Sequence, residues 1–227
     1  MSLFDAASAG DIETVKKLLD AGSNSDGEDT WTNWTPLHAA AQAGNIQICE
    51  MLLNCGANPS QSTDTGYTPL HLAASGGFVD VVELLLQCKV PLDNLTYAGL
   101  YGSPLHYAAG KGHLEIVKKL VSAGADKNLL SEEHCTPLYY AVLGRQEAVV
   151  NYFVSAQCDL SIPDEDGTTP LHGAAQVGSI NCARILVNAN ASLEARDRFG
   201  RTPADIAKEL GCSELMNFLL QKQKNIL

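Results

Sequence analysis

A four-residue phrase that recurs along the chain restricts what this sequence can fold into. It reads Thr-Pro-Leu-His at residues 35–38 and returns, intact or slightly changed, five more times. The six copies begin at Thr35, Thr68, Ser103, Thr136, Thr169 and Thr202. Successive prolines of the phrase lie 33, 35, 33, 33 and 33 residues apart. A period of this length predicts an array of stacked repeats, because one such unit alone cannot bury its apolar face.

Each residue of the phrase suits the start of a helix. The first backbone N–H groups of a helix have no acceptor within it, and the Thr35 hydroxyl can supply one. Pro36 follows at the first helical position, where its missing N–H costs nothing. Leu37 begins an apolar face that continues at Ala40 and Ala41, and the small alanines allow a second helix to pack closely.

A glycine and a second apolar pattern follow the phrase in most units. In one unit Gly77 precedes Val79, Val82 and Leu85, which share one face of a helix. The pattern predicts a helix, a tight turn and an antiparallel helix. About ten turn-forming residues then lead to the next phrase.

The phrase and its period resemble the ankyrin repeat family, whose unit is a β-turn finger followed by two antiparallel helices. The resemblance implies an all-α ankyrin-repeat solenoid of about seven stacked helix-turn-helix units with β-turn or hairpin fingers. We therefore expect a single domain over residues 2–227. Its expected parts are an N-terminal capping repeat at 2–34, five internal repeats at 35–201, a C-terminal capping repeat at 202–220 and a frayed tail at 221–227.

Three departures from the pattern stand out. Lys89 occupies the place where glycine usually ends the second helix, a place that favours a left-handed backbone. The next finger carries a two-residue insertion around 97–102, which predicts a longer or differently folded loop. In the fifth repeat Arg145 replaces the turn glycine, and Glu147 stands in an apolar column. Either this unit is distorted or its alignment slips by one residue.

Charge and cysteine content exclude several classes of protein. The net charge of −11 opposes binding to a nucleic-acid backbone. The seven cysteines include no CxxC pair, which argues against a zinc site. The absence of a signal peptide and of a long apolar run predicts an intracellular protein without membrane insertion. We expect it in the cytoplasm, with the nucleus as the alternative.

The sequence offers no set of residues for catalysis or for a cofactor. Histidines such as His38 and His71 recur one repeat apart, too far to converge on one metal ion, so we expect them to bond the capping hydroxyl and nearby backbone groups. The segment 110–112 lacks the upstream glycine and the hydroxyl residue of a phosphate loop. We therefore expect no catalytic, cofactor-binding or metal-binding residues and no enzymatic activity. A triad assembled from distant residues remains a remote alternative.

The positions that the repeat leaves free carry the functional expectation. By the resemblance, fingertips and the residues before each turn glycine line the concave face. The residues expected to contact a partner are Trp31, Trp34, Tyr67, Leu100, Tyr101, Lys111, Glu132, Glu133, Glu165 and Asp166. Exposed aromatic side chains are typical interface anchors. The alternative for the two tryptophans is that they cover the core of the first repeat.

These observations predict a monomeric interaction module rather than an enzyme. Its partner is expected to be a protein or peptide with a basic and apolar segment, because the face is aromatic early and acidic in the middle. An inhibitory or regulatory subunit of an enzyme such as a kinase is the alternative function.

Overall fold

The computed structural model describes residues 1–27 and 32–224, which form fourteen α-helices and no strand. The chain divides into two compact units, and each is described by itself. Unit 1 comprises Met1–Ala108 and Lys119–Ala125, and unit 2 comprises Ala109–Lys118 and Asp126–Leu227. No helix among the described residues is both long and apolar enough to cross a membrane. All seven cysteines are free thiols.

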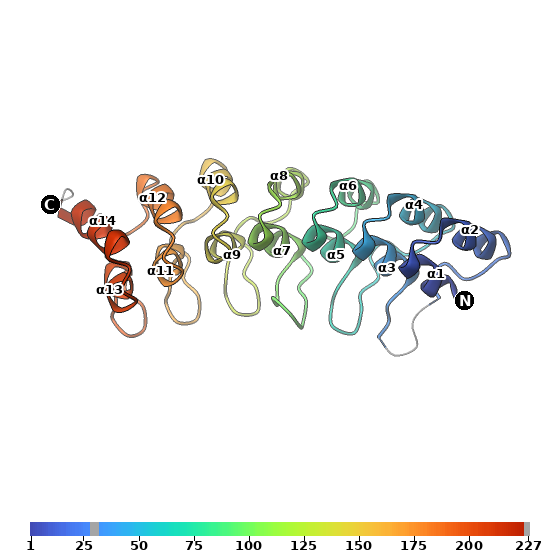
Figure 1. Ribbon diagram of the computed structural model, residues 1–227, viewed down its shortest axis with the longest axis horizontal. Helices are drawn as coiled ribbons and strands as arrows, with labels where there is room; N and C mark the ends of the chain where they lie inside the picture. Colours follow the sequence, from blue (N-terminus) through green and yellow to red (C-terminus); the bar gives the residue numbers. More distant parts are fainter. Residues whose placement is uncertain (28–31, 225–227) are drawn as a thin grey trace. The chain divides into compact units, whose positions relative to one another are not determined.

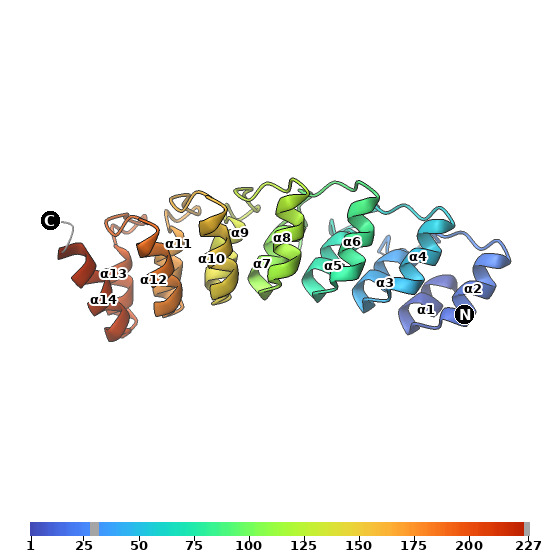
Figure 2. The same ribbon diagram turned by 90° about the horizontal axis from the view of Figure 1, so that it is seen from above.

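Unit 1 is built from helix pairs that stack side by side (Figure 1). Its complete helices are α1 (Leu3–Ala9), α2 (Ile12–Asp20), α3 (Pro36–Ala43), α4 (Ile46–Asn54), α5 (Pro69–Gly76) and α6 (Val79–Gln87). The first helices of the pairs, α1, α3 and α5, pack in one row. The second helices, α2, α4 and α6, pack in another row, as Figure 2 shows.

Unit 2 repeats this arrangement. The division between the units runs through α7 (Pro104–Lys111) and α8 (Leu114–Ser122). The remaining helices are α9 (Pro137–Leu143), α10 (Glu147–Ser155), α11 (Pro170–Gln176), α12 (Ile180–Asn188), α13 (Pro203–Glu209) and α14 (Ser213–Lys224). The last helix, α14, continues to Lys224, so residues 221–224 are helical, and fraying of the tail stays a prediction. Residues 225–227 lie outside the described part.

At the starts of α3, α5 and α11 the phrase histidine joins the helix to the following finger. The Thr35 backbone N–H donates to His38 Nδ1 at 3.1 Å, and His38 Nε2 lies 3.1 Å from the Tyr67 carbonyl oxygen. Since Nδ1 faces a donor, the ring proton belongs on Nε2, which donates to that carbonyl. In the same way, His71 Nε2 lies 3.0 Å from the Asn94 carbonyl oxygen, and His172 Nε2 lies 3.0 Å from the Arg201 carbonyl oxygen. The structural role predicted for these histidines is confirmed.

The leucines and alanines of the phrase helices form the core with the apolar residues of the second helices. Leu37, Leu105 and Leu138 have no exposed surface, and Leu70 exposes 1%. Phe153 of α10 is also fully buried. Apolar burial of this kind supplies the main stabilisation of a repeat stack.

The fifth repeat keeps its register. Arg145 stands in the turn-glycine column and adopts the left-handed backbone of that column, with φ of +55°. Gly144 instead allows close packing against α7, because a Cβ there would lie 2.3 Å from the Gly110 carbonyl oxygen. Glu147 does not enter the core. Its side chain is exposed at the start of α10 and accepts a hydrogen bond from Asn181 at 2.7 Å.

Three helix ends place a side chain where other repeats have glycine, and one of them is Asn190, with φ of +64°, a residue type that adopts a left-handed backbone more readily than others. The other two, Lys89 and Gln157, both have φ of +54°, whereas Gly56 and Gly124 serve the equivalent positions in other repeats. A left-handed backbone costs roughly 1–2 kcal/mol for a residue with a Cβ. Each of these two positions therefore carries local strain that glycine would relieve.

Gln157→Gly is expected to raise the free energy of unfolding by about 0.5–1 kcal/mol, because the relieved strain exceeds the added flexibility of glycine in the unfolded chain. The Gln157 side chain is exposed, so little packing is lost. Urea unfolding of wild type and variant measures the change. Gln157→Ala is the matched control, because alanine keeps the Cβ and should give no gain. Equal stabilisation by both substitutions would contradict the explanation.

Candidate partner-binding surfaces

The fingers of each unit form a surface of distinct character. We call the finger residues Trp34, Tyr67, Tyr97, Leu100 and Tyr101 of unit 1 the aromatic finger surface. We call Glu132, Glu133, Glu165 and Asp166 of unit 2 the acidic finger surface. The expected contact residue Trp31 lies outside the described residues. Lys111 is exposed at the C-terminal end of α7, in its unit 2 portion.

Backbone hydrogen bonds connect the neighbouring fingers of unit 1. The Asp64 N–H donates to the Thr32 carbonyl at 3.3 Å, and the Tyr97 N–H donates to the Thr65 carbonyl at 2.8 Å. Each fingertip is thus attached to the one before it. The aromatic side chains stand on loops held in place, so little conformational entropy remains to be lost on binding.

The lengthened finger folds back onto one tyrosine of α7. The Tyr107 hydroxyl lies 3.0 Å from Thr96 Oγ1 and 2.8 Å from the Tyr67 hydroxyl, and it accepts from the Leu100 N–H at 3.2 Å. Gly99 is required here, because its φ is +75° and an added Cβ would lie 2.2 Å from the Tyr67 hydroxyl. The two-residue insertion therefore produces a longer, ordered loop.

The expected aromatic anchors differ in their availability. Tyr67 is half-buried, and its hydroxyl bonds to Tyr107, so it belongs largely to the scaffold. Leu100 and Tyr101 are also half-buried. Trp34 is half-buried with its ring centroid 5.8 Å from that of His38, so it both covers the helix start and keeps an exposed part.

Tyr97 is an exposed aromatic residue that the sequence analysis did not select as a contact residue. Its side chain is 65% exposed at the tip of the lengthened finger. The signal was present, since Tyr97 begins the one finger that carries an insertion. The repeat pattern alone could not tell which of the inserted residues would point outward.

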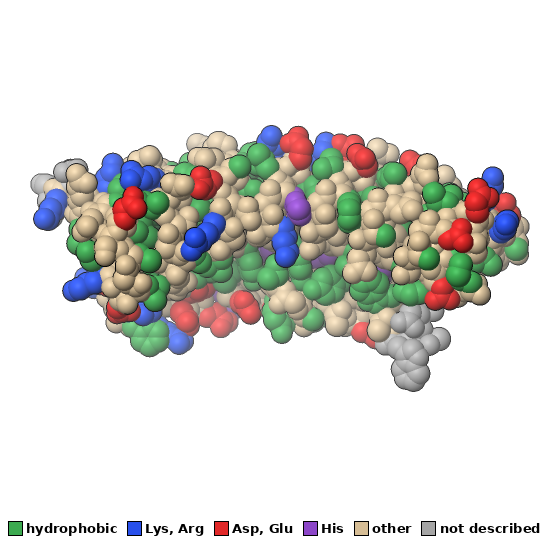
Figure 3. Space-filling view, viewed as in Figure 1, with side chains coloured by type: hydrophobic (Ala, Val, Ile, Leu, Met, Phe, Trp, Pro, Cys, Tyr) green, Lys and Arg blue, Asp and Glu red, His purple; other side chains and the backbone are tan. Residues whose placement is uncertain are grey.

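The acidic finger surface of unit 2 combines paired and unpaired carboxylates. Figure 3 shows acidic side chains gathered over the loops that precede α9 and α11. Glu165 contacts His134 Nδ1 at 3.0 Å, and Asp166 pairs with Arg198 at 2.6 Å. Glu132 and Glu133 are exposed and make no ion pair within the described part of the chain.

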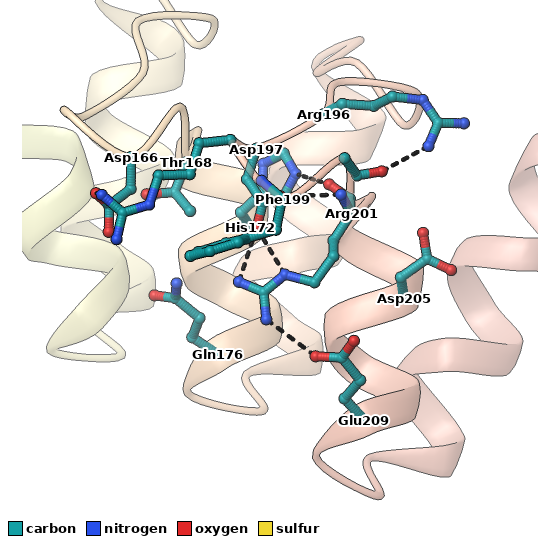
Figure 4. A network of polar contacts seen from close by, with 12 residues as sticks. Asp166, Thr168, His172, Gln176, Arg196, Asp197, Phe199, Arg201, Asp205 and Glu209 are labelled. Atoms are coloured by element: carbon teal, nitrogen blue, oxygen red, sulfur yellow. Dashed lines mark hydrogen bonds and ion pairs between the residues drawn. The ribbon is translucent and has the colours of Figure 1, made fainter.

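The last finger of unit 2 is fixed by a polar network, drawn in Figure 4. Asp197 accepts from the backbone N–H groups of Phe199 and Arg201 at 2.9 Å and from Arg201 Nε at 2.8 Å. Burial opposes the charge of Asp197, but these hydrogen bonds hold its pKa below the ordinary value. Phe199 is 64% exposed, with the guanidinium carbons of Arg198 and Arg201 4.8 and 5.0 Å from its ring centre.

The described residues include no cluster of three or more His, Cys, Asp or Glu side chains that could hold a metal ion. The Tyr67 and Tyr107 hydroxyls bond to each other, to Thr96 and to the lengthened finger. The two finger surfaces present aromatic rings in unit 1, of which Tyr97 is exposed, and exposed carboxylates in unit 2.

In a comparison with known proteins, one family of repeats matches three successive segments of the sequence. The sequence matches the family described as "Ankyrin repeats (3 copies)" over residues 3–95, 92–164 and 146–227. The ankyrin repeat domain of human ASB11 has a similar structure, with a TM-score of 0.88, 26% identity and coverage of 98% of this chain and 97% of that one.

Curated relatives share shorter segments. The mouse 2-5A-dependent ribonuclease is 48% identical over 26% of this chain and 8% of its own length. "Ankyrin repeat, SAM and basic leucine zipper domain-containing protein 1" of Dasypus novemcinctus is 30% identical over 53% of this chain and 26% of its length. Human "Ankyrin repeat and SOCS box protein 3" is 29% identical over 58% and 19%. The chain spans about a quarter or less of these relatives.

Proposed function

Since the chain belongs to the ankyrin repeat family and has its all-α solenoid fold, we propose that it is a protein-interaction module whose fingers contact a partner protein. The observation that carries the proposal is the aromatic finger surface. A ring that is 65% exposed, as in Tyr97, stands on a loop held by hydrogen bonds, where the fold does not require it. Rigid exposed aromatics are the usual centres of protein interfaces.

The acidic finger surface supports a basic group in the partner. Glu132 and Glu133 are exposed and make no ion pair among the described residues. Exposed charges of this kind mainly accelerate encounter with an oppositely charged partner. We further propose that the chain is a monomer without catalytic activity and acts in the cytoplasm.

The test begins with affinity purification of the partner and titration of the purified protein. Trp34→Ala is expected to weaken binding by about 2 kcal/mol or more if its ring fills a pocket. Glu132→Lys is expected to lower the association rate and its dependence on salt rather than to speed dissociation. Glu132 is exposed and Trp34 is half-buried against His38, so neither change should unfold the chain, which thermal unfolding checks.

Lys118→Ala is the control, because Lys118 projects from α8 and is 46% exposed in an ion pair with Glu115. The Lys118→Ala variant should bind the partner with the affinity of wild type. Weaker binding by Lys118→Ala together with unchanged binding by Trp34→Ala would place the interface on the outer helices. That result would overturn the proposal that the fingers form the interface.

A further inference from the structure

We propose that the aromatic finger surface of unit 1 recognises an arginine side chain, with the guanidinium bound by Asp64 and stacked on the ring of Tyr97. The inference rests on the proposed function and specifies the chemistry of its partner. Four features of unit 1 support it: its charge, the environment of Asp64, the flanking rings and the uncharged histidines beneath them.

The charge of this region favours a cationic ligand. Residues 18–88 contain eight Asp and Glu residues and no Lys or Arg. A stretch of this length without a single cationic side chain contrasts with residues 179–227, which hold seven Lys and Arg and five Asp and Glu. An arriving guanidinium therefore meets no fixed cation on the fingers that precede α3 and α5, and the local field draws it in.

Asp64 presents a carboxylate whose charge is not neutralised by a cation. It is exposed on the finger that precedes α5. Its side chain accepts a hydrogen bond from the Asn33 amide, and its N–H donates to the Thr32 carbonyl at 3.3 Å. An amide fixes the position of the carboxylate but adds no charge. The remaining lone pairs of Asp64 can accept the two parallel N–H groups of a guanidinium.

The fingers on both sides of Asp64 carry aromatic rings. Asn33 binds the carboxylate, and Trp34 follows it in the chain. On the other side, the Tyr97 N–H donates to the carbonyl of Thr65, the residue after Asp64. A planar guanidinium can pair with a carboxylate and stack on a ring at the same time, whereas an ammonium is a compact point charge that does neither as well. The arrangement therefore favours arginine over lysine.

The histidines under the rings remain uncharged and do not repel a cation. The rings of Trp34 and His38 lie 5.8 Å apart, and those of Tyr67 and His71 lie 6.1 Å apart. In both histidines Nδ1 accepts a backbone N–H, at 3.1 Å from Thr35 and 3.2 Å from Thr68. A proton on Nδ1 would oppose that donor, so both rings stay neutral near pH 7.

The experiment titrates fluorescein-labelled hexa-arginine and hexa-lysine peptides against the full chain by fluorescence anisotropy at fixed salt. Hexa-arginine is expected to bind at least about fivefold more tightly than hexa-lysine. Asp64→Asn and Tyr97→Ala should each weaken hexa-arginine binding about tenfold. Tyr97→Phe should restore the wild-type affinity, because it keeps the ring.

Glu50→Gln is the matched control, since it also turns an exposed carboxylate of residues 18–88 into an amide, on the helix α4 instead of a finger. It should leave hexa-arginine binding unchanged. Equal affinity for the two peptides, equal losses in Asp64→Asn and Glu50→Gln, or no binding of hexa-arginine would each overturn the arginine inference.

The same variants separate this inference from the proposed function. If the purified protein partner binds Asp64→Asn as well as wild type but loses affinity for Trp34→Ala, the fingers form the interface and the arginine inference alone is wrong. If the partner binds Trp34→Ala, Tyr97→Ala and Asp64→Asn as well as wild type, the proposed finger interface fails and the inference fails with it.

Discussion

Leu70→Ala is expected to lower the free energy of unfolding by about 2–5 kcal/mol. Leu70 exposes only 1% of its surface at the start of α5. Its removal loses buried methyl groups and leaves a cavity that the surrounding side chains fill only in part. Urea unfolding followed by circular dichroism gives the free energy for wild type and variant.

Leu210→Ala provides the same chemical change at a site that is 57% exposed. Its effect should stay within about 0.5 kcal/mol, the range of ordinary surface substitutions. A Leu70→Ala effect as small as that of Leu210→Ala would mean that the phrase leucine does not carry the core.

Lowering the pH from 7 to 5 is expected to remove roughly 2 kcal/mol of stability for each of His38 and His71. Burial lowers the pKa of both imidazoles from 6.5 to about 4. As the pH falls, the two histidines therefore bind protons in the unfolded chain before they do so in the folded chain. The stability contributed by the neutral rings is complete above pH 6.5, and it falls as the pH drops from there toward 4.

The hydrogen bonds explain the same preference for the neutral ring. Protonation of Nδ1 would place an N–H against the backbone N–H of Thr35 or Thr68, which lies about 3 Å away. Between pH 7 and pH 5 most carboxylates stay ionised, since their ordinary pKa values lie near 4. The histidines therefore dominate the change in this window.

Urea unfolding of wild type and His71→Asn at both pH values tests this prediction. The amide oxygen of asparagine can still accept the Thr68 N–H but does not titrate, so the variant should lose roughly 2 kcal/mol less than wild type between pH 7 and pH 5. His134→Asn is the comparison variant, because it removes an exposed imidazole that contacts Glu165 and lies outside the helix caps. Parallel losses in wild type and His71→Asn would contradict the assignment.

The local features of the fold could be predicted from the sequence because they depend on residues close together in the chain. Pro36 at the first helical position and the cap at Thr35 arise within one turn of helix. The left-handed backbone of Lys89 followed in the same way from its place in the repeat. Side chains three or four residues apart determine these features, and the period of 33 repeats them along the chain.

Features that depend on distant residues were not predicted. The Tyr107 hydroxyl bonds to Tyr67, forty residues away, and it also accepts from the Leu100 N–H of the lengthened finger. Arg145 showed an irregular unit in the sequence, yet the register is kept because a residue with a Cβ tolerates the left-handed turn. Glu147 likewise faces solvent, where Asn181 of the next repeat binds it.

The chemistry of the helix caps also determines where repeats can separate. At His38, His71 and His172 an imidazole closes its own helix and donates to the next finger, so opening either repeat breaks a bond between them. In α1 and α13 a carboxylate, from Asp5 or Asp205, closes the cap instead. An ionised carboxylate has no proton to donate and cannot reach a carbonyl in a neighbour. The first repeat therefore has no histidine bond to the finger that follows it, whereas His172 holds the last repeat through Arg201, so we expect opening to begin at the N-terminal repeat.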